Sequence, residues 1–192
     1  MNESTNITHL LNQWVAGNSL IETELINAVY PLLRAVAHKQ LNKVKDSSMN
    51  TTLIVNELYL KLRKQNRIKL NNKNHFLALS ARLIRQIIVD NIRSNKALKR
   101  GLLYQQVTLY EHELNAASSI KNNEMNVDWL TLNKLLNELE SIDPESVKLI
   151  ELRFFAGLNL QEIAEVCNTS VSSVSRNWRF ARSWLLNKLK DN

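Results

Sequence analysis

The 192-residue sequence has few of the residues that interrupt or cross-link a chain: three glycines, two prolines and one cysteine. Because Cys167 is the single cysteine, no internal disulfide can form, which favours the cell interior. The scarcity of glycine and proline argues against a loop-rich β protein. Apolar runs such as Leu53–Val55 and Ile87–Val89 are far shorter than the roughly 18 residues of a membrane span. We therefore expect a soluble, cytoplasmic protein with no membrane span and no secretion signal.

The sequence also lacks any pattern of catalytic or metal-binding side chains. No histidine lies near Cys167 or near a pair of carboxylates at metal-ligand spacing, and the four lie in different segments: His9, His38, His75 and His112. The three glycines are isolated, so there is no glycine-rich phosphate loop. We expect a protein that is not an enzyme, that uses no cofactor or metal, and in which Cys167 is a small packed side chain.

What the chain does have is apolar residues, 44% of the total, and an uneven positive charge of +7. Residues 1–100 contain 16 Lys and Arg against 6 Asp and Glu, a net charge of +10. Residues 101–144 carry a net charge of −5, and residues 145–192 carry +2. A positive net charge suggests an anionic partner, and this distribution indicates where such a partner would bind.

Apolar residues recur at helical spacing along most of the chain. The pattern predicts helices over residues 7–15, 22–41, 52–65, 75–99 and 129–142. Pro31 lies inside the second of these, where it removes a backbone donor, so a kink or break is expected near Asn27–Tyr30. Pro144 follows Asp143 and suits the first turn of a further helix.

Residues 101–128 lose the helical spacing and become polar, which is typical of a linker. We therefore predict an all-α fold made of two small helical domains, residues 1–100 and 129–192, joined by a flexible acidic linker over residues 101–128.

The final fifty residues predict two helices joined by a tight turn. Asn159 and Glu162 have the spacing of a capping box, Cys167–Thr169 forms the turn, and Ser170 can cap a second helix. On that helix Val171, Val174, Trp178, Ala181 and Leu185 should face inward. This is helix-turn-helix spacing, with an outward face for a DNA major groove made of Ser172, Ser173, Ser175, Arg176 and Arg179. The alternative is an ordinary helical hairpin with a solvated basic face.

Four segments together resemble one family, the extracytoplasmic-function group of bacterial RNA polymerase sigma factors. Residues 147–158 resemble the approach to its promoter-reading helix-turn-helix, and residues 170–185 its recognition helix. Residues 55–62 are similar to the segment that binds the polymerase clamp, and residues 81–93 to the helix that reads the minus-ten element.

The resemblance implies a sigma factor that binds core RNA polymerase, directs it to specific promoters and promotes transcription initiation by sequence-specific DNA binding. Polymerase would be bound by Asn56, Glu57, Lys61 and Arg63. The minus-thirty-five element would be read by Ser172, Ser173, Ser175, Arg176 and Arg179. The minus-ten element would be contacted by Arg82, Arg85, Gln86, Arg93, Lys96, Lys99 and Arg100. The partners are then core RNA polymerase and promoter DNA, and an anti-sigma factor is a further partner that the resemblance allows.

Helical spacing adds detail to the minus-ten helix. Asp90 and Arg93 lie one turn apart and can pair. We expect Arg82, Arg85 and Gln86 to form a solvent-facing stripe that holds a displaced single strand. No tryptophan is present there, so aromatic help in opening the duplex would fall to His75 or Phe76, residues that are more often core.

Two other functions fit the same pattern. One is a repressor or response-regulator output protein, whose N-terminal helices would form a dimerisation or sensing module and which would bind a palindrome as a dimer. The other is a nonspecific nucleic-acid binder.

Overall fold

A computed structural model describes residues 3–44, 49–64, 70, 72–98, 106–109 and 125–190. The N-terminal elements are α1 (Glu3–Val15), η1 (Ser19–Ile21), α2 (Glu22–Leu41), α3 (Thr51–Lys64) and α4 (Lys73–Leu98). The C-terminal elements are α5 (Trp129–Ile142), α6 (Pro144–Ile150), the π-helical η3 (Glu151–Ala156), α7 (Leu160–Cys167) and α8 (Val171–Lys190). The predicted all-α class is confirmed. None of the described helices is long and apolar enough to cross a lipid bilayer.

One short antiparallel ribbon accompanies the helices. Strand β1 (Gln106–Leu109) pairs with β2 (Met125–Asp128), with Gln106 opposite Asp128 and Leu109 opposite Met125. Only a linker was expected here, although each strand alternates polar and apolar residues over its four positions, the shortest run that indicates a strand.

Local capping explains where the C-terminal helices begin. The Asn159 side chain accepts a hydrogen bond from the Glu162 amide, and the Glu162 carboxylate accepts one from the Asn159 amide, so the capping box is confirmed. The Ser170 hydroxyl accepts from the Ser173 amide at 3.2 Å, as predicted. Pro144 occupies the first turn of α6 behind an Asp143 cap.

Of the kink or break predicted near Asn27–Tyr30, the break is wrong, because α2 runs as one helix from Glu22 to Leu41 with Pro31 inside it. Pro31 and Asn27, whose carbonyl loses its partner, are both exposed, so water can hydrate that carbonyl. The opposite face of α2 is buried along its length and holds the helix in place. Its buried apolar residues are Leu25, Val29, Leu33, Val36, Ala37 and Leu41.

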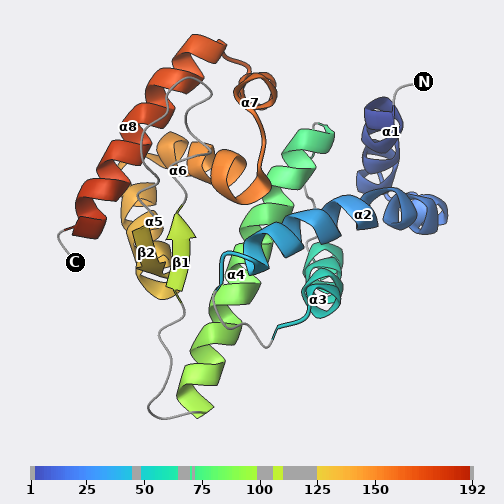
Figure 1. Cartoon of the computed structure of the whole chain (residues 1–192). Helices are drawn as coiled ribbons and strands as arrows, with labels where there is room; N and C mark the ends of the chain where they lie inside the picture. Colours follow the sequence, from blue (N-terminus) through green and yellow to red (C-terminus); the bar gives the residue numbers. More distant parts are fainter. Residues whose placement is uncertain are drawn as a thin grey trace.

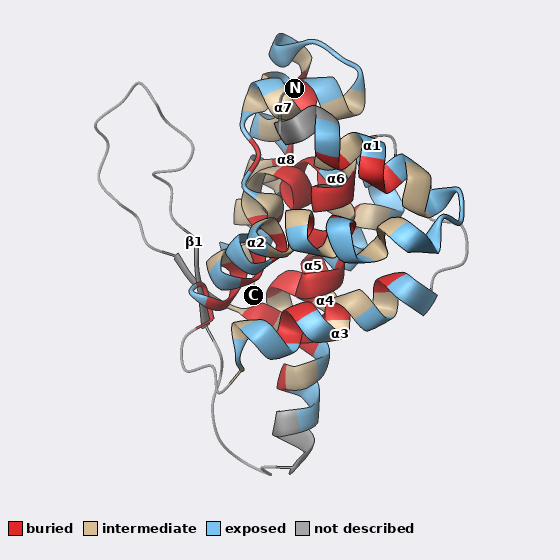
Figure 2. Ribbon diagram, turned by 90° about the vertical axis from the view of Figure 1, so that its right-hand side faces the viewer, coloured by how far each residue is buried: buried red, intermediate tan, exposed pale blue. Residues whose placement is uncertain are grey.

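Helix α4 crosses the middle of the molecule (Figure 1). It packs against α1, α2 and α3 on one side and against η3, α5 and α7 on the other. Buried residues therefore extend through α4 and α5 as one continuous core (Figure 2), which includes Leu58, Ile84, Ile88, Leu136 and Phe155. A smaller core joins η3, α6, α7 and α8 through Leu149, Leu152, Leu158, Ile163, Ala164 and Val174.

Two left-handed backbone positions turn the chain sharply between C-terminal helices. Gly157 ends η3 with φ of 80°, and a Cβ at this position would lie 2.7 Å from Lys39 Nζ. Asn168 ends α7 with φ of 49°, in the tight turn before α8. These turns fix the directions in which α7 and α8 leave the core.

Candidate nucleic-acid and polymerase-binding surfaces

Helix α8 presents most of its predicted DNA-binding residues to solvent. Ser172, Arg176 and Arg179 are exposed, whereas Ser173 and Ser175 are half-buried. The Ser170 hydroxyl links to the Ser172 and Ser173 hydroxyls at 3.0 and 2.9 Å. Arg179 donates to the Ser175 carbonyl at 3.4 Å. The helix therefore offers two arginines and a cluster of hydroxyls on its outer side.

The opposite side of α8 packs as predicted, with one exception. Val174, Ala181 and Leu185 are buried, and Trp178 is half-buried against the core. Val171, the first residue of α8, is exposed, so the prediction that it faces inward is wrong.

Sequence reasoning missed Phe180 on this surface. Its side chain is 57% exposed and lies one turn beyond Arg176. The sequence does contain a signal for it, because Phe180 is a large apolar residue four positions after Arg176, a predicted DNA-contacting residue. An exposed aromatic ring there can contact the methyl group of a thymine.

The predicted minus-ten residues fall into four groups. Arg93 is exposed and lies 3.9 Å from Asp90, so the predicted i, i+3 pair is confirmed. Gln86 is half-buried. Lys96 belongs to α4 but its side chain lies outside the described residues, as do Lys99 and Arg100 entirely.

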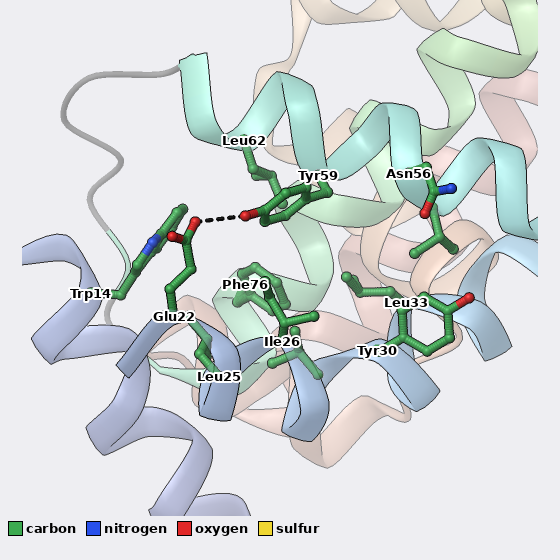
Figure 3. Close-up of a pocket in the computed structure, with 12 residues that line it drawn as sticks. Trp14, Glu22, Leu25, Ile26, Tyr30, Leu33, Asn56, Tyr59, Leu62 and Phe76 are labelled. Atoms are coloured by element: carbon green, nitrogen blue, oxygen red, sulfur yellow. Dashed lines mark hydrogen bonds between the residues drawn. The ribbon is translucent and has the colours of Figure 1, made fainter. Parts of the chain in front are cut away.

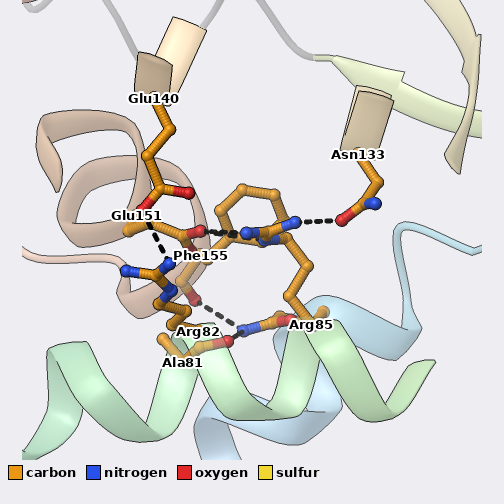
Figure 4. Close-up of polar contacts among 8 residues, drawn as sticks. Ala81, Arg82, Arg85, Asn133, Glu140, Glu151 and Phe155 are labelled. Carbon is orange, nitrogen blue, oxygen red and sulfur yellow. Dashed lines mark hydrogen bonds and ion pairs between the residues drawn. The ribbon is translucent and has the colours of Figure 1, made fainter. Parts of the chain in front are cut away.

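Arg82 and Arg85 form the fourth group, and the prediction that Arg85 faces solvent is wrong. Arg85 is 3% exposed and donates two hydrogen bonds to Glu151, at 2.9 and 2.6 Å, and a third to Asn133 (Figure 4). Arg82 is exposed but pairs with Glu140 at 2.7 Å. The helical pattern could not reveal this burial, because the covering residues come from 48 to 66 positions later in the chain.

Two effects of opposite sign act on the pKa of Glu151 in this buried pair. Burial raises the pKa of Glu151, and the Arg85 guanidinium acts in the other direction. Phe155 packs beside the pair, with the Arg85 guanidinium 5.5 Å from the ring centroid. The arrangement is a buried ion pair between α4 and η3.

The predicted polymerase-binding residues lie along α3. Asn56 and Arg63 are exposed, and Glu57 and Lys61 are half-buried. Lys61 lies 3.9 Å from Glu57 and 3.7 Å from Asp90, which links α3 to α4. Two exposed leucines that the prediction did not include, Leu53 and Leu60, add an apolar component to the helix surface.

Beside this helix is a small apolar pocket of about 140 Å³ between α1, α2, α3 and α4 (Figure 3). Trp14, Tyr30, Asn56 and Phe76 are among its lining residues. At one end the Tyr59 hydroxyl donates to Glu22 at 2.6 Å, and Arg63 lies 3.3 Å from the same carboxylate. Burial and this hydrogen bond raise the pKa of Tyr59.

The aromatic residues near these surfaces mostly serve the core. Phe76 is buried, which excludes it as an exposed wedge, and Trp129 is buried with its ring edge-to-face against Phe155. Trp14, Trp178 and Trp184 are partly buried against the same core.

The described part of the chain contains no group of three or more metal-ligating side chains. Cys167 is half-buried against the smaller core, and burial raises the pKa of its thiol. A raised pKa keeps the thiol protonated and unreactive, in agreement with a packing role.

These features define a class: an all-α protein with an exposed basic helix after a tight turn and a second basic helix at its centre. The family model described as ECF sigma factor matches residues 4–191, and the chain belongs to this family. It is a transcription initiation factor rather than an enzyme.

One solved structure that the chain resembles is the sigma factor RpoE from Bartonella quintana, determined in complex with the anti-sigma factor NepR. The two sequences are 19% identical, the alignment covers 88% of this chain and 96% of that one, and the TM-score is 0.38. A search of curated protein sequences gave no match.

Proposed function

We propose that this sigma factor binds core RNA polymerase, directs it to specific promoters and reads both promoter elements by sequence-specific DNA binding. The observation that carries the proposal is the outer face of α8, where exposed Arg176 and Arg179 follow a capped, tightly turned α7. A helix so presented can enter a major groove with its N-terminal residues toward the bases.

The exposed side of α8 offers three kinds of side chain for contact with DNA. Arg176 and Arg179 can make bidentate contacts to guanine or to phosphates, and the three serines act at shorter range. Phe180 extends this face with an apolar contact. Together these residues would read the minus-thirty-five element.

On α4 the exposed Arg93 continues into Lys96, Lys99 and Arg100, which would meet phosphates of the minus-ten region. Gln86, Arg82 and Arg85 would hold the displaced strand. In the described conformation the C-terminal helices cover Arg85, so this contact requires them to move away from α4.

Polymerase would bind the α3 surface through Asn56, Glu57, Lys61 and Arg63, with Leu53 and Leu60 alongside. Glu57→Lys reverses the charge at the centre of this surface without touching the buried side of α3. We expect core polymerase to bind this variant at least about tenfold more weakly, and unchanged binding would contradict the assignment.

In this proposal residues 1–100 and 129–192 are the two functional domains, and residues 101–128 are the linker between them. An anti-sigma factor would be a competitor, because it would cover the surfaces that polymerase uses.

Transcription in vitro with bacterial core polymerase, with and without this protein, tests the proposal. We expect initiation at specific promoters only when both are present, and a monomeric sigma factor in sedimentation. Failure to direct initiation at any promoter of a genomic library would contradict the proposal. A dimer that binds a palindrome without polymerase would instead identify a repressor.

A further inference from the structure

The pocket between α1, α2, α3 and α4 has the walls of a small ligand site (Figure 3). Its lining is almost entirely apolar: six of the twelve residues are aliphatic and four are aromatic, namely Trp14, Tyr30, Tyr59 and Phe76. Phe76 is buried, whereas Trp14 and Tyr30 are half-buried and Asn56 is exposed. The pocket therefore reaches from the core of the N-terminal helices to the surface, where a molecule can enter.

The size of the pocket selects the class of occupant. Its volume is about 140 Å³. A cavity of about 150 Å³ with apolar walls remains dry and holds one benzene molecule. A nucleotide or a peptide helix is too large for this space, so the occupant is a molecule of about one ring. Aromatic walls favour an aromatic occupant, because rings attract one another in offset and edge-to-face arrangements.

One end of the pocket is polar and can orient such a ring. The Glu22 carboxylate lines this end, and its Oε1 accepts the hydrogen bond from the Tyr59 hydroxyl at 2.6 Å. Oε1 also lies 3.3 Å from Arg63 Nε. The second oxygen of Glu22, Oε2, accepts no hydrogen bond from the residues that the structure describes. Because a carboxylate is only an acceptor, Oε2 can receive an N–H or O–H group of a ligand.

The same end selects against charged ligands. Arg63 already balances the charge of Glu22, so a cationic ligand would compete with that guanidinium for one carboxylate. An anionic ligand would meet the Glu22 charge directly. Either ion would also have to leave water for apolar walls, which is costly without a dedicated partner. A neutral molecule with one donor avoids these costs.

We propose that this pocket is a binding site for a small, uncharged aromatic molecule with one hydrogen-bond donor, of which phenol is the simplest. Its ring would pack against the apolar walls, and its donor would bind Glu22 Oε2. The proposal goes beyond the proposed function and does not rest on it, because binding is measured on the protein alone.

Three probes of similar size separate the contributions of ring, donor and charge. Phenol has the ring and the donor. Toluene has the same ring with a methyl group in place of the hydroxyl, and benzoate carries a negative charge. We expect phenol and toluene to bind the full-length protein saturably, and benzoate not to bind at the same concentrations.

Nuclear magnetic resonance of the tryptophan indole N–H groups measures binding at a known place. The chain has four tryptophans, and Trp14→Phe identifies the signal of the one that lines the pocket. Trp129, Trp178 and Trp184 are not among the lining residues and serve as internal controls. We expect phenol to move the Trp14 signal with saturation and to leave the other three in place.

Substitution of Glu22 tests the donor contact. Glu22→Met keeps the length of the side chain and removes both oxygens. Glu24→Met is the matched control, because Glu24 lies in the same first turn of α2, is exposed and does not line the pocket. Hydrogen bonds to a charged group are the stronger ones, so the ratio of phenol affinity to toluene affinity should fall about tenfold in Glu22→Met. It should be unchanged in Glu24→Met.

A third variant, Val29→Phe, fills the pocket with a ring of its own. Val29 is a buried lining residue, and the added ring occupies the space that the ligand needs. We expect this variant to bind neither phenol nor toluene. If it fails to fold by circular dichroism, the comparison of Glu22→Met with Glu24→Met still decides the result.

Three results would overturn the proposal. The first is no saturable movement of the Trp14 signal with phenol, or equal movement of all four signals. The second is undiminished binding in a folded Val29→Phe variant. The third is the same ratio of phenol to toluene affinity in Glu22→Met and Glu24→Met, since Glu22 would then not receive the donor.

Discussion

His75, at the start of α4, is half-buried close to Lys148 of α6. Burial and the Lys148 charge lower the pKa of this histidine below its ordinary value of 6.5. The unfolded chain therefore binds a proton at a higher pH than the folded chain does, so the free energy of unfolding falls as the pH drops through 6.5. Urea denaturation at several pH values should show this loss, and His75→Gln should reduce it. An unchanged slope in that variant would contradict the pKa shift.

Arg176 is the residue on α8 that best separates base reading from phosphate binding. If Arg176 contacts a base, Arg176→Ala should cost about 1–3 kcal/mol on its promoter and relax the preference at one position. Lys190→Ala, which removes one charge from the far end of the same helix, is the control. Binding of promoter variants by the polymerase complex measures both. An equal loss on every sequence would reassign Arg176 to a phosphate.

Single residues were predictable where the governing contact is local. Asn159, Ser170 and Asp143 each cap a helix through an amide three residues away, so their spacing is sufficient evidence. Arg85 was not predictable, because its burial depends on Glu151, 66 positions further along the chain. A charged residue in a helical pattern is usually solvated, and only the tertiary structure shows that a carboxylate covers this one.

At the scale of elements, the turn between α7 and α8 depends on a left-handed asparagine. Asn168 is exposed and has φ of 49°, and the Thr169 amide donates to the Ala164 carbonyl at 3.0 Å to close the helix end. Asn168→Ala should therefore destabilise the fold by about 1 kcal/mol, since alanine pays a steric cost in this conformation. Asn168→Gly should be as stable as the wild-type protein or more so. Thermal unfolding of the two variants measures the difference, and equal melting temperatures would contradict the backbone explanation.

Helix positions followed from apolar spacing, and the boundaries of α2 and α5 match the predicted ranges. Two features of the fold could not be predicted from apolar spacing. The continuity of α2 through Pro31 depends on burial along its whole length, which outweighs one lost hydrogen bond. The ribbon of β1 and β2 forms between two segments whose polar and apolar residues alternate over only four positions each, the shortest run that indicates a strand. In both cases long-range packing decides the structure.

At the scale of the whole molecule, the two halves differ in net charge. The N-terminal hundred residues carry +10 and the last 48 carry +2, so DNA binding by each half would depend on polymerase to a different degree. A helix-turn-helix with so little net charge gains little nonspecific affinity from phosphates. The minus-thirty-five contact would then depend on polymerase to hold α8 near its site.

The continuous core predicts that both halves unfold together. Apolar residues from α1 to α8 belong to one cluster that passes through α4, so no plane separates the halves without exposing apolar surface. In urea, circular dichroism and tryptophan fluorescence should report one coincident transition. Two resolved transitions in the wild-type protein would contradict this.

The ion pair of Arg85 and Glu151 sets how strongly the halves are coupled. Glu151→Ala leaves a buried guanidinium without its carboxylate, which should cost about 3–5 kcal/mol. Replacing both partners, Arg85→Met with Glu151→Met, removes the desolvation penalty and fills the same space with apolar atoms. We expect this double variant to recover most of the loss in urea denaturation. If it is no more stable than Glu151→Ala, the single variant acts through lost packing, and the pair is not what couples α4 to η3. Recovery would mean that the ionic contact is retained at the expense of stability, as expected of an interface that has to open.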